Sequence, residues 1–398
     1  MILALSLIYA LFSFVYLLFD TVSVPDGIYP GFLDLNFLLK YVECFNNGFN
    51  PYIDKNSICI GELNYPLILL KLFIKLGLGP DHTYVIGFTF IVGFVISVSL
   101  LFKKLTIKQF ILLLLIFISP PILFLLERGN IDILIFILIV FSIFYIRKKH
   151  NVYRIYLSYL IILIASFLKI FPFFLLPLIF IEKIQLKHKI IIFTLFTSFF
   201  FLYIYSILDE LKFIFEKTPK PSELAFGKNV LIQEFISEKY LPFFSIFPFV
   251  IGSFFFFLKR KWVYVIYERI NSDYQNTLMF TSGVLIFFGI YFIGNNYDYR
   301  LVYFVLFLPT IFQLNSTDKN ILFFKRFLLI SIIIILSVSF LHRSVHIYQN
   351  YTQWFVCRNF LMSLKYLLMT IIVSFSSIYF YFIIIENLKE IKSFFNKN

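Results

Sequence analysis

Blocks of apolar residues, most of them about 16–22 residues long, alternate with short polar segments along almost the whole chain. An α-helix of that length crosses the hydrocarbon layer of a bilayer. The pattern predicts about twelve transmembrane helices, at 2–19, 83–102, 109–126, 131–146, 154–169, 170–182, 190–208, 242–258, 278–294, 301–314, 327–342 and 360–385. We therefore expect an all-α, polytopic integral membrane protein in which residues 1–398 form a single transmembrane domain.

The connecting segments differ in charge when they are taken alternately. One set carries the basic clusters Lys103, Lys104 and Lys108; Arg147, Lys148 and Lys149; Lys183, Lys187 and Lys189; Lys259, Arg260 and Lys261; Lys325 and Arg326; and the tail after Glu386. The positive-inside rule makes these segments and both termini cytoplasmic. The other set lies outside, and its longest members are residues 20–82 and 209–241.

The first outside loop, residues 20–82, contains two stretches with helical spacing. One follows a candidate N-cap at Asp34, and the other runs from Tyr65-Pro66 to Leu76. Their pattern is typical of helices that lie along the membrane interface. Cys44 and Cys59 fall in the same loop, and an oxidising compartment would permit their disulfide, but the sequence leaves the pairing open.

Composition agrees with lipid as the main solvent, because 60% of the residues are hydrophobic and 14% are charged. Soluble domains carry roughly 25% charged residues. The net charge of +13 comes from basic clusters between apolar blocks, as expected for topological signals, so we expect no nucleic-acid partner. Residues 1–19 lack a basic start and a small-residue cleavage site, which predicts a retained helix rather than a signal peptide.

Four polar clusters stand near predicted bilayer depth, where each ionisable group costs about 2.5–3.5 kcal/mol to insert. They are Glu127-Arg128-Gly129-Asn130-Ile131-Asp132, the break at Lys169-Ile170-Phe171-Pro172, Asn295-Asn296-Tyr297-Asp298-Tyr299-Arg300, and Asp34 in the first loop. All four fall on the predicted outer side. This convergence indicates a polar pocket for an amphiphile with an anionic head group.

Each cluster also has a structural alternative. Glu127 can pair with Arg128 or cap a helix, Lys169 can extend to the interface or pair with an acid, Asp298 and Arg300 can form a salt-bridged turn, and Asp34 can serve only as an N-cap. Asp20 and Asp26 are rival acids in the first loop.

The pocket permits transfer of a sugar from a lipid phosphate, which leaves with its negative charge. A carboxylate would take the proton from the acceptor hydroxyl, and cations would hold the departing phosphate. Asp34 is the candidate base, and Arg128, Lys169 and Arg300 are the candidate phosphate ligands. We expect no metal and no cofactor, because His342 and His346 lack a third ligand. The sequence also contains no glycine-rich phosphate-binding loop, which argues against direct use of a soluble nucleotide donor.

The chain resembles the GT-C class of membrane glycosyltransferases, in particular glycosyltransferase family 87, which includes polyprenyl-phosphate-mannose-dependent mannosyltransferases. The resemblance rests on Asp34 followed by Gly48-Phe49-Asn50-Pro51-Tyr52 and Asn64-Tyr65-Pro66, on Glu127-Arg128-Gly129-Asn130, on Lys169-Ile170-Phe171-Pro172, and on Asn296-Tyr297-Asp298-Tyr299-Arg300. Many GT-C enzymes have an acidic pair in the first loop, whereas Asp34 stands between Leu33 and Leu35.

This resemblance implies a hexosyltransferase, with mannose as the hexose, that acts at the extracytoplasmic face with inversion and with Asp34 as the general base. The implied partners are a polyprenyl-phosphate-linked sugar donor, a lipid or glycan acceptor, and membrane lipids, in the plasma (inner) membrane. Supporting roles fall to Glu127, Asn130, Asp132, Tyr297, Asp298, Tyr52 and Tyr65.

Two other functions stay open. A flippase or transporter of a lipid-linked solute also needs buried charge, but transporters usually place it near the midplane and often have duplicated halves. This chain places its charge at one face and shows no duplication. An oligosaccharide repeat-unit polymerase has similar composition, but such enzymes tend to use arginine in large outside loops, and 209–241 contains none.

Overall fold

The computed structural model describes residues 31–54, 59, 63–102, 104–147, 152–217, 225–226, 246–293, 296–314, 317–346 and 352–395, and these are almost entirely helical. The predicted helix at 2–19 and the rival acids Asp20 and Asp26 lie outside these residues. The helices and strands are α2 (Leu33–Asn46), α3 (Leu67–Lys75), η1 (Pro80–His82), α4 (Thr83–Leu101), α5 (Ile107–Phe117), α6 (Pro120–Arg128), α7 (Asp132–Arg147), α8 (Val152–Leu168), η2 (Phe171–Ile181), α9 (Leu186–Ser206), α10 (Leu208–Lys217), β1 (Ala225–Phe226), α13 (Phe247–Leu258), α14 (Arg260–Asn271), α15 (Tyr274–Ile293), β2 (Asn296–Tyr297), η3 (Asp298–Phe307), α16 (Leu308–Gln313), α17 (Lys319–His346) and α18 (Thr352–Phe395).

The apolar blocks predicted within the described residues all form helices, but the count of twelve spans is not confirmed. By length and composition, five described helices can cross a membrane, within α4 with η1, α9, α15, α17 and α18. The pair α5 and α6, bent by 57°, raises the number to six. Pro120 and Pro121 start α6 and explain the bend, because proline cannot continue the preceding helix. Four shorter apolar helices lie within α7, α8, η2 and α13.

Helix α4 shows how lipid acts as the solvent. It is apolar on all sides, and it buries Phe90 and Phe94 while Val85 and Val92 remain 68% and 58% exposed. A surface helix of a soluble protein would carry polar residues at such positions. The outward face of α4 is therefore suited to contact with acyl chains.

The centre of the molecule is the 3-10 helix η3, continued by α16. Every residue from Leu301 to Leu308 is at most 1% exposed. The segment packs against α6, α15 and α17, and Pro309 lies in the first turn of α16. Because η3 is enclosed in this way, the charged residues at its start are fixed relative to the surrounding helices.

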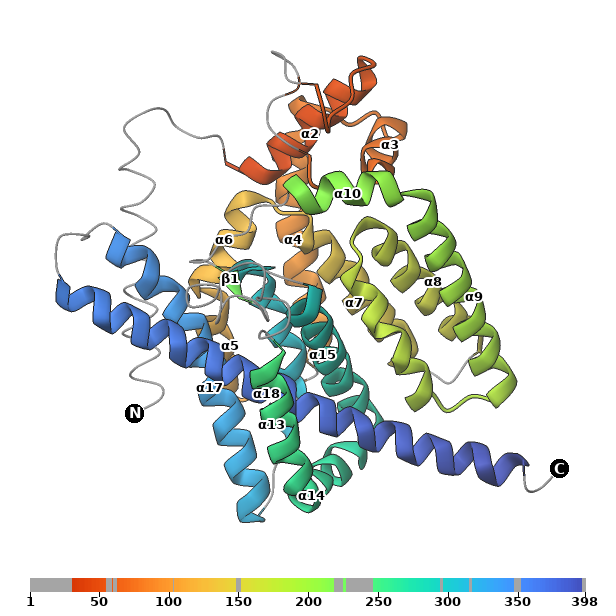
Figure 1. Ribbon diagram of the computed structural model, residues 1–398, viewed down its shortest axis with the longest axis vertical. Coiled ribbons are helices and arrows are strands. Elements are labelled where there is room, and N and C mark those ends of the chain that lie inside the picture. Colours follow the sequence, from red (N-terminus) through yellow and green to blue (C-terminus); the bar gives the residue numbers. More distant parts are fainter. Residues whose placement is uncertain are drawn as a thin grey trace.

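Helices α2, α3 and α10 gather at one end of the molecule, at the top of Figure 1, and α14 lies at the opposite end. The Cys44–Cys59 disulfide joins the end of α2 to the following loop, so the pairing that the sequence left open is present. Strand β1, from the second large loop, pairs antiparallel with β2. Helix α14 was not predicted, because its charged residues interrupt the apolar pattern, but it buries Val263, Ile266 and Ile270.

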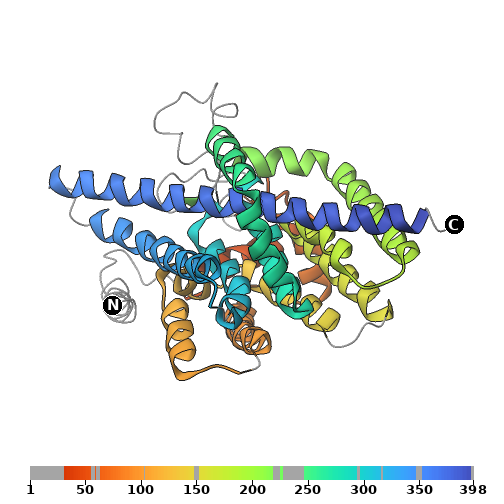
Figure 2. The ribbon, with the colours of Figure 1, turned by 90° about the horizontal axis from the view of Figure 1, so that it is seen from below.

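The last two helices extend beyond the compact part of the bundle. Helix α18 has 44 residues, and Figure 2 shows it crossing the full width of the molecule with α17 beside part of its length. Along this path α18 packs against α13, α14, α15 and η2. It therefore crosses the bundle from side to side and passes close to the start of η3, where Lys365 contacts Asp298.

Candidate functional site

Asp34 lies in the first turn of α2, and the prediction that it caps this helix is wrong. The N-cap is Phe32, and no side chain caps the first turn. The Asp34 carboxylate points instead to the turn after α6. Oδ1 accepts a hydrogen bond from Arg128 Nε at 2.7 Å and forms an ion pair with Arg128 Nη2 at 2.5 Å, and Oδ2 accepts a hydrogen bond from Asn130 Nδ2 at 2.6 Å.

Gly129 makes this double contact possible. It ends α6 in the left-handed conformation, with a φ of 59°, which glycine adopts without a steric penalty. The chain reverses there, so that Arg128 before the turn and Asn130 after it reach the same carboxylate. The alternative pairing of Glu127 with Arg128 is absent: Glu127 is exposed, and its carbonyl accepts the Phe32 N–H at 2.8 Å.

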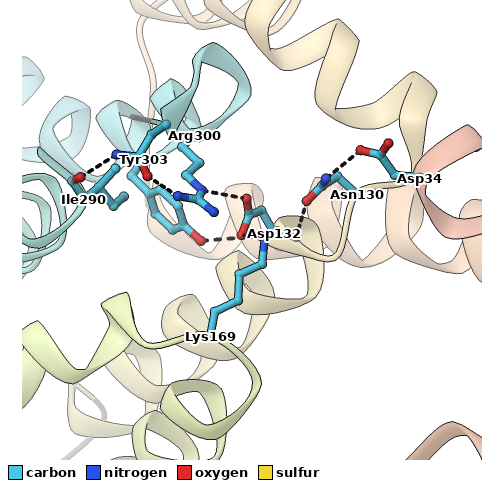
Figure 3. A network of polar contacts seen from close by, with 8 residues as sticks. Asp34, Asn130, Asp132, Lys169, Ile290, Arg300 and Tyr303 are labelled. Atoms are coloured by element: carbon cyan, nitrogen blue, oxygen red, sulfur yellow. Dashed lines mark hydrogen bonds and ion pairs between the residues drawn. The ribbon is translucent and has the colours of Figure 1, made fainter. Parts of the chain in front are cut away.

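Asp132 begins α7 and is fully buried. Its backbone N–H donates to Asn130 Oδ1 at 3.0 Å. Its carboxylate forms ion pairs with two cations, Lys169 Nζ at 2.7 Å from Oδ1 and Arg300 Nε at 3.1 Å from Oδ2. Figure 3 shows the resulting chain of contacts, which runs from Asp34 through Asn130 and Asp132 to Lys169 and Arg300.

Lys169 and Arg300 reach Asp132 from two separate segments that both follow it in the sequence. Lys169 follows the last residue of α8, in the break before η2, and the predicted alternative of pairing with an acid is confirmed. Arg300 lies in the first turn of η3, donates to Asn296 Oδ1, and places its guanidinium 5.4 Å from the centre of the Phe171 ring. The two carboxylates Asp34 and Asp132 thus face three cations, which leaves one surplus positive charge.

A cavity of about 320 Å³ opens beside the outer part of this network, within the range of ligand pockets. It is lined by Asp34, Phe37, Leu38, Tyr41, Asn64, Tyr65, Phe124, Arg128, Asn130, Tyr297 and Tyr299. Among the lining residues that the structure describes, Arg128 is the cation and Asp34 is the acid. Lys169 and Arg300 are not part of the lining, and their side chains are only 9% and 19% exposed.

Aromatic side chains form much of the cavity wall. Tyr297 and Tyr299 stack with their ring centres 5.5 Å apart, and the Arg128 guanidinium lies 5.1 Å from the centre of the Phe124 ring. Flat aromatic faces beside hydrogen-bonding groups suit a ligand that is partly apolar and partly polar. Asn64, Phe124 and Tyr299 had no predicted role in the site, although Asn64 and Tyr299 fall within its motifs.

Tyr65 and Tyr52 connect the first loop to the site. Burial, with Tyr299, Asp34 and Asp132 nearby, raises the pKa of Tyr65 well above its ordinary value, so its hydroxyl stays protonated. Lys169 Nζ lies 5.2 Å from the centre of the Tyr65 ring. Tyr52 does not line the cavity; its hydroxyl lies 2.7 Å from the Tyr65 carbonyl oxygen and 3.3 Å from Glu210 at the start of α10.

Asp298 pairs with Lys365 rather than with Arg300, so the predicted alternative of a salt-bridged turn is wrong. Lys365 Nζ lies 2.5 and 2.6 Å from the two carboxylate oxygens, and the lysine side chain is completely buried. Sequence analysis missed Lys365. The signal was a single lysine inside the predicted span 360–385, where an isolated charge needs a partner.

Among the residues that the structure describes, no group of three or more histidine, cysteine, aspartate or glutamate residues lies close enough to hold a metal ion. The side chains of His342 and His346 are outside that description.

Fold and site together define a helical membrane protein with a carboxylate and a guanidinium at the wall of one cavity, and with surplus positive charge behind it. The model of glycosyltransferase family 87 matches residues 64–233. This match confirms the resemblance predicted from the sequence: over these residues, which are fewer than half of the chain, the protein is similar to glycosyltransferase family 87. No curated protein and no solved structure matches the chain.

The matched residues contain Arg128, Asn130, Asp132 and Lys169 but neither Asp34 nor Arg300. The structure brings these two residues to the matched part through direct ion pairs. The site is therefore assembled from inside and outside the matched region.

Proposed function

We propose that the protein transfers a hexose, with mannose as the first candidate, from a polyprenyl-phosphate donor to a lipid or glycan acceptor. Transfer takes place at the extracytoplasmic face with inversion at the anomeric carbon. Asp34 is the proposed general base, and Arg128, Lys169 and Arg300 provide the positive charge for the phosphate. The observation that carries this proposal is that Asp34 and Arg128, a base and a phosphate ligand, line the same cavity.

The proposed reaction is a single displacement. The acceptor oxygen forms a bond to C1 of the sugar and gives its proton to Asp34. The bond between C1 and the phosphate oxygen breaks, and its electron pair leaves with the phosphate. The phosphate needs fixed positive charge as it departs. Attack and departure occur on opposite faces of C1, which is why inversion is expected.

The three cations have different proposed parts, because they lie at different depths. Arg128 lines the cavity, with 30% of its side chain exposed, and its planar fork can meet two phosphate oxygens at once. Lys169 and Arg300 share Asp132 deeper in the protein. In this proposal their positive charges stabilise the leaving phosphate from a distance, and Asp132 orients both side chains.

The membrane orientation in this proposal follows from the basic connecting segments. By the positive-inside rule, they favour an orientation with the site end of the molecule outside and both termini in the cytoplasm. The plasma membrane is the proposed location. The Cys44–Cys59 disulfide at the site end supports this orientation, because disulfides persist in oxidising compartments. Helices α2, α3 and α10 would then lie at the outer interface.

The test is Asp34→Asn. Purified protein in lipid vesicles should form a glycosylated product from a polyprenyl-phosphate hexose, and the variant should lose about 10²–10⁴-fold in kcat, the usual contribution of a general base. Asp81→Asn, at an exposed acid of η1, is the matched control and should keep full activity. Full activity of folded Asp34→Asn would eliminate the mechanism, and movement of the lipid-linked solute without any covalent product would indicate a transporter.

A further inference from the structure

Phe32, the N-cap residue of α2, has a backbone conformation that phenylalanine rarely adopts. Its φ of 63° and ψ of 45° lie in the left-handed region, and among the described residues it is the one non-glycine residue with a positive φ. Bulky residues at such angles persist where surrounding contacts enforce them, often near functional sites. Phe32 lies two residues before the proposed base.

Backbone and side-chain contacts both hold Phe32 in place. Its N–H donates to the Glu127 carbonyl, and its own carbonyl accepts from the Asn36 N–H, each at 2.8 Å. Its ring meets Tyr84 and Phe88 of α4 edge to face, with centres 6.2 and 5.5 Å apart. The residue is only 7% exposed, so it joins α2, α4 and the turn after α6.

Two glycines make room for this side chain. A Cβ at Gly87 would lie 2.4 Å from the Phe32 ring, and a Cβ at Gly129 would lie 3.0 Å from Phe32 Cβ. Gly129 stands between Arg128 and Asn130, the two residues that bind Asp34. Phe32 therefore packs directly on the turn that carries both partners of the proposed base.

We propose that Phe32 is a positioning residue, which fixes the start of α2 against α4 and the 127–130 turn and thereby sets the place of Asp34. This role rests on the proposed function, because Phe32 acts through Asp34. Without the ring, the start of α2 can shift within the space between Gly87 and Gly129. A misplacement of about 1 Å at a catalytic group can cost about a hundredfold in rate.

The test compares Phe32→Ala with Leu39→Ala in the full chain, reconstituted in lipid vesicles. Leu39 is fully buried on the same helix and does not line the cavity. Phe32→Ala should lower kcat about ten- to a hundredfold and change the donor KM less than about threefold, because Arg128 is retained. Leu39→Ala should lower the melting temperature but leave kcat per folded protein unchanged. A merely structural role for Phe32 predicts equal kcat values for the two variants, which would overturn the proposal.

Two further variants test the contact itself. Gly87→Ala should lower kcat in the natural background but cause no additional loss in Phe32→Ala, because the clash requires the ring. Phe32→Gly accepts the left-handed conformation but lacks the ring, so it should be as slow as Phe32→Ala. Full activity of Phe32→Gly, or additive effects of Gly87→Ala and Phe32→Ala, would overturn the positioning role. Failure of the proposed function would be detected in a different experiment, as full activity of the Asp34→Asn variant.

Discussion

Arg128 has two competing partners in the proposed reaction. It donates a hydrogen bond to one oxygen of Asp34 and forms an ion pair with the same oxygen, and among the described residues it is also the cation at the wall of the cavity. A phosphate that enters the cavity must therefore compete with Asp34 for the guanidinium. Once the phosphate takes Arg128, Oδ1 of Asp34 is released to accept a proton from the acceptor.

Competition for Arg128 predicts that Asp34→Asn strengthens binding of the lipid phosphate while it removes catalysis. A charge-assisted hydrogen bond contributes about 1.5–3 kcal/mol, so freeing Arg128 should lower the Kd of a polyprenyl phosphate by about tenfold or more. Calorimetry in detergent micelles measures this affinity without turnover. An unchanged or higher Kd would contradict the competition.

The Arg128→Gln background separates competition from a general charge effect. Loss of the Asp34 charge favours any nearby anion, whether or not Arg128 is present. Direct competition requires that Asp34→Asn has almost no effect on Kd once Arg128 is absent. An effect of equal size in both backgrounds would show that Arg128 is not the shared partner.

At the scale of elements, η3 is held in place by contacts with several other parts of the chain. Its start is fixed by the pairing of β2 with β1, by Arg300 on Asp132, and by Lys365 of α18 on Asp298. The last of these pairs lies inside the protein, where removal of one partner leaves an uncompensated charge. The pair therefore ties η3 to α18 at the level of the site.

Lys365→Met should destabilise the protein by about 3–5 kcal/mol, because Asp298 is then buried without a partner. The double variant Asp298→Leu with Lys365→Met removes both charges and should recover most of this loss. Thermal unfolding in detergent measures both effects. If the Lys365→Met variant had the same melting temperature as the natural protein, the ion pair would not stabilise the contact between η3 and α18.

The sequence predicted most helices of the bundle and the residues of the polar network at the candidate site, because apolar block length and buried charge are local signals. It identified Asp34, Arg128, Asn130, Asp132, Lys169 and Arg300, and these form one connected network. It did not predict that Asp132 takes two cations, because partners separated by 168 residues depend on tertiary packing. Phe32 carried no signal, because an apolar residue at a helix start reveals nothing about its φ.

At the scale of the whole molecule, the two ends differ in the chemistry they carry. The end with α2, α3 and α10 holds the disulfide and the site, and α14 with its Arg260 and Lys261 lies at the other end. The proposed orientation places these ends in different compartments. Both ends offer exposed lysines that allow a matched test.

Lys71→Cys on α3 and Lys261→Cys on α14, each at an exposed position, should react differently with a membrane-impermeant thiol reagent in intact cells. A Cys357→Ser background leaves the new cysteine as the free thiol, since Cys44 and Cys59 are paired. Position 71 should react without permeabilisation and position 261 only after it. Reaction of both from the same side would contradict the proposed orientation.

The surplus positive charge behind the cavity also bears on what happens after the sugar has moved. A sugar-bearing lipid phosphate is a diester with one negative charge, whereas the lipid phosphate left behind is a monoester with a charge of about −1.5 to −2 at neutral pH. The same cations would thus hold the spent carrier more firmly than the fresh one. Departure of the empty lipid, rather than formation of the new glycosidic bond, would then limit how often the enzyme turns over.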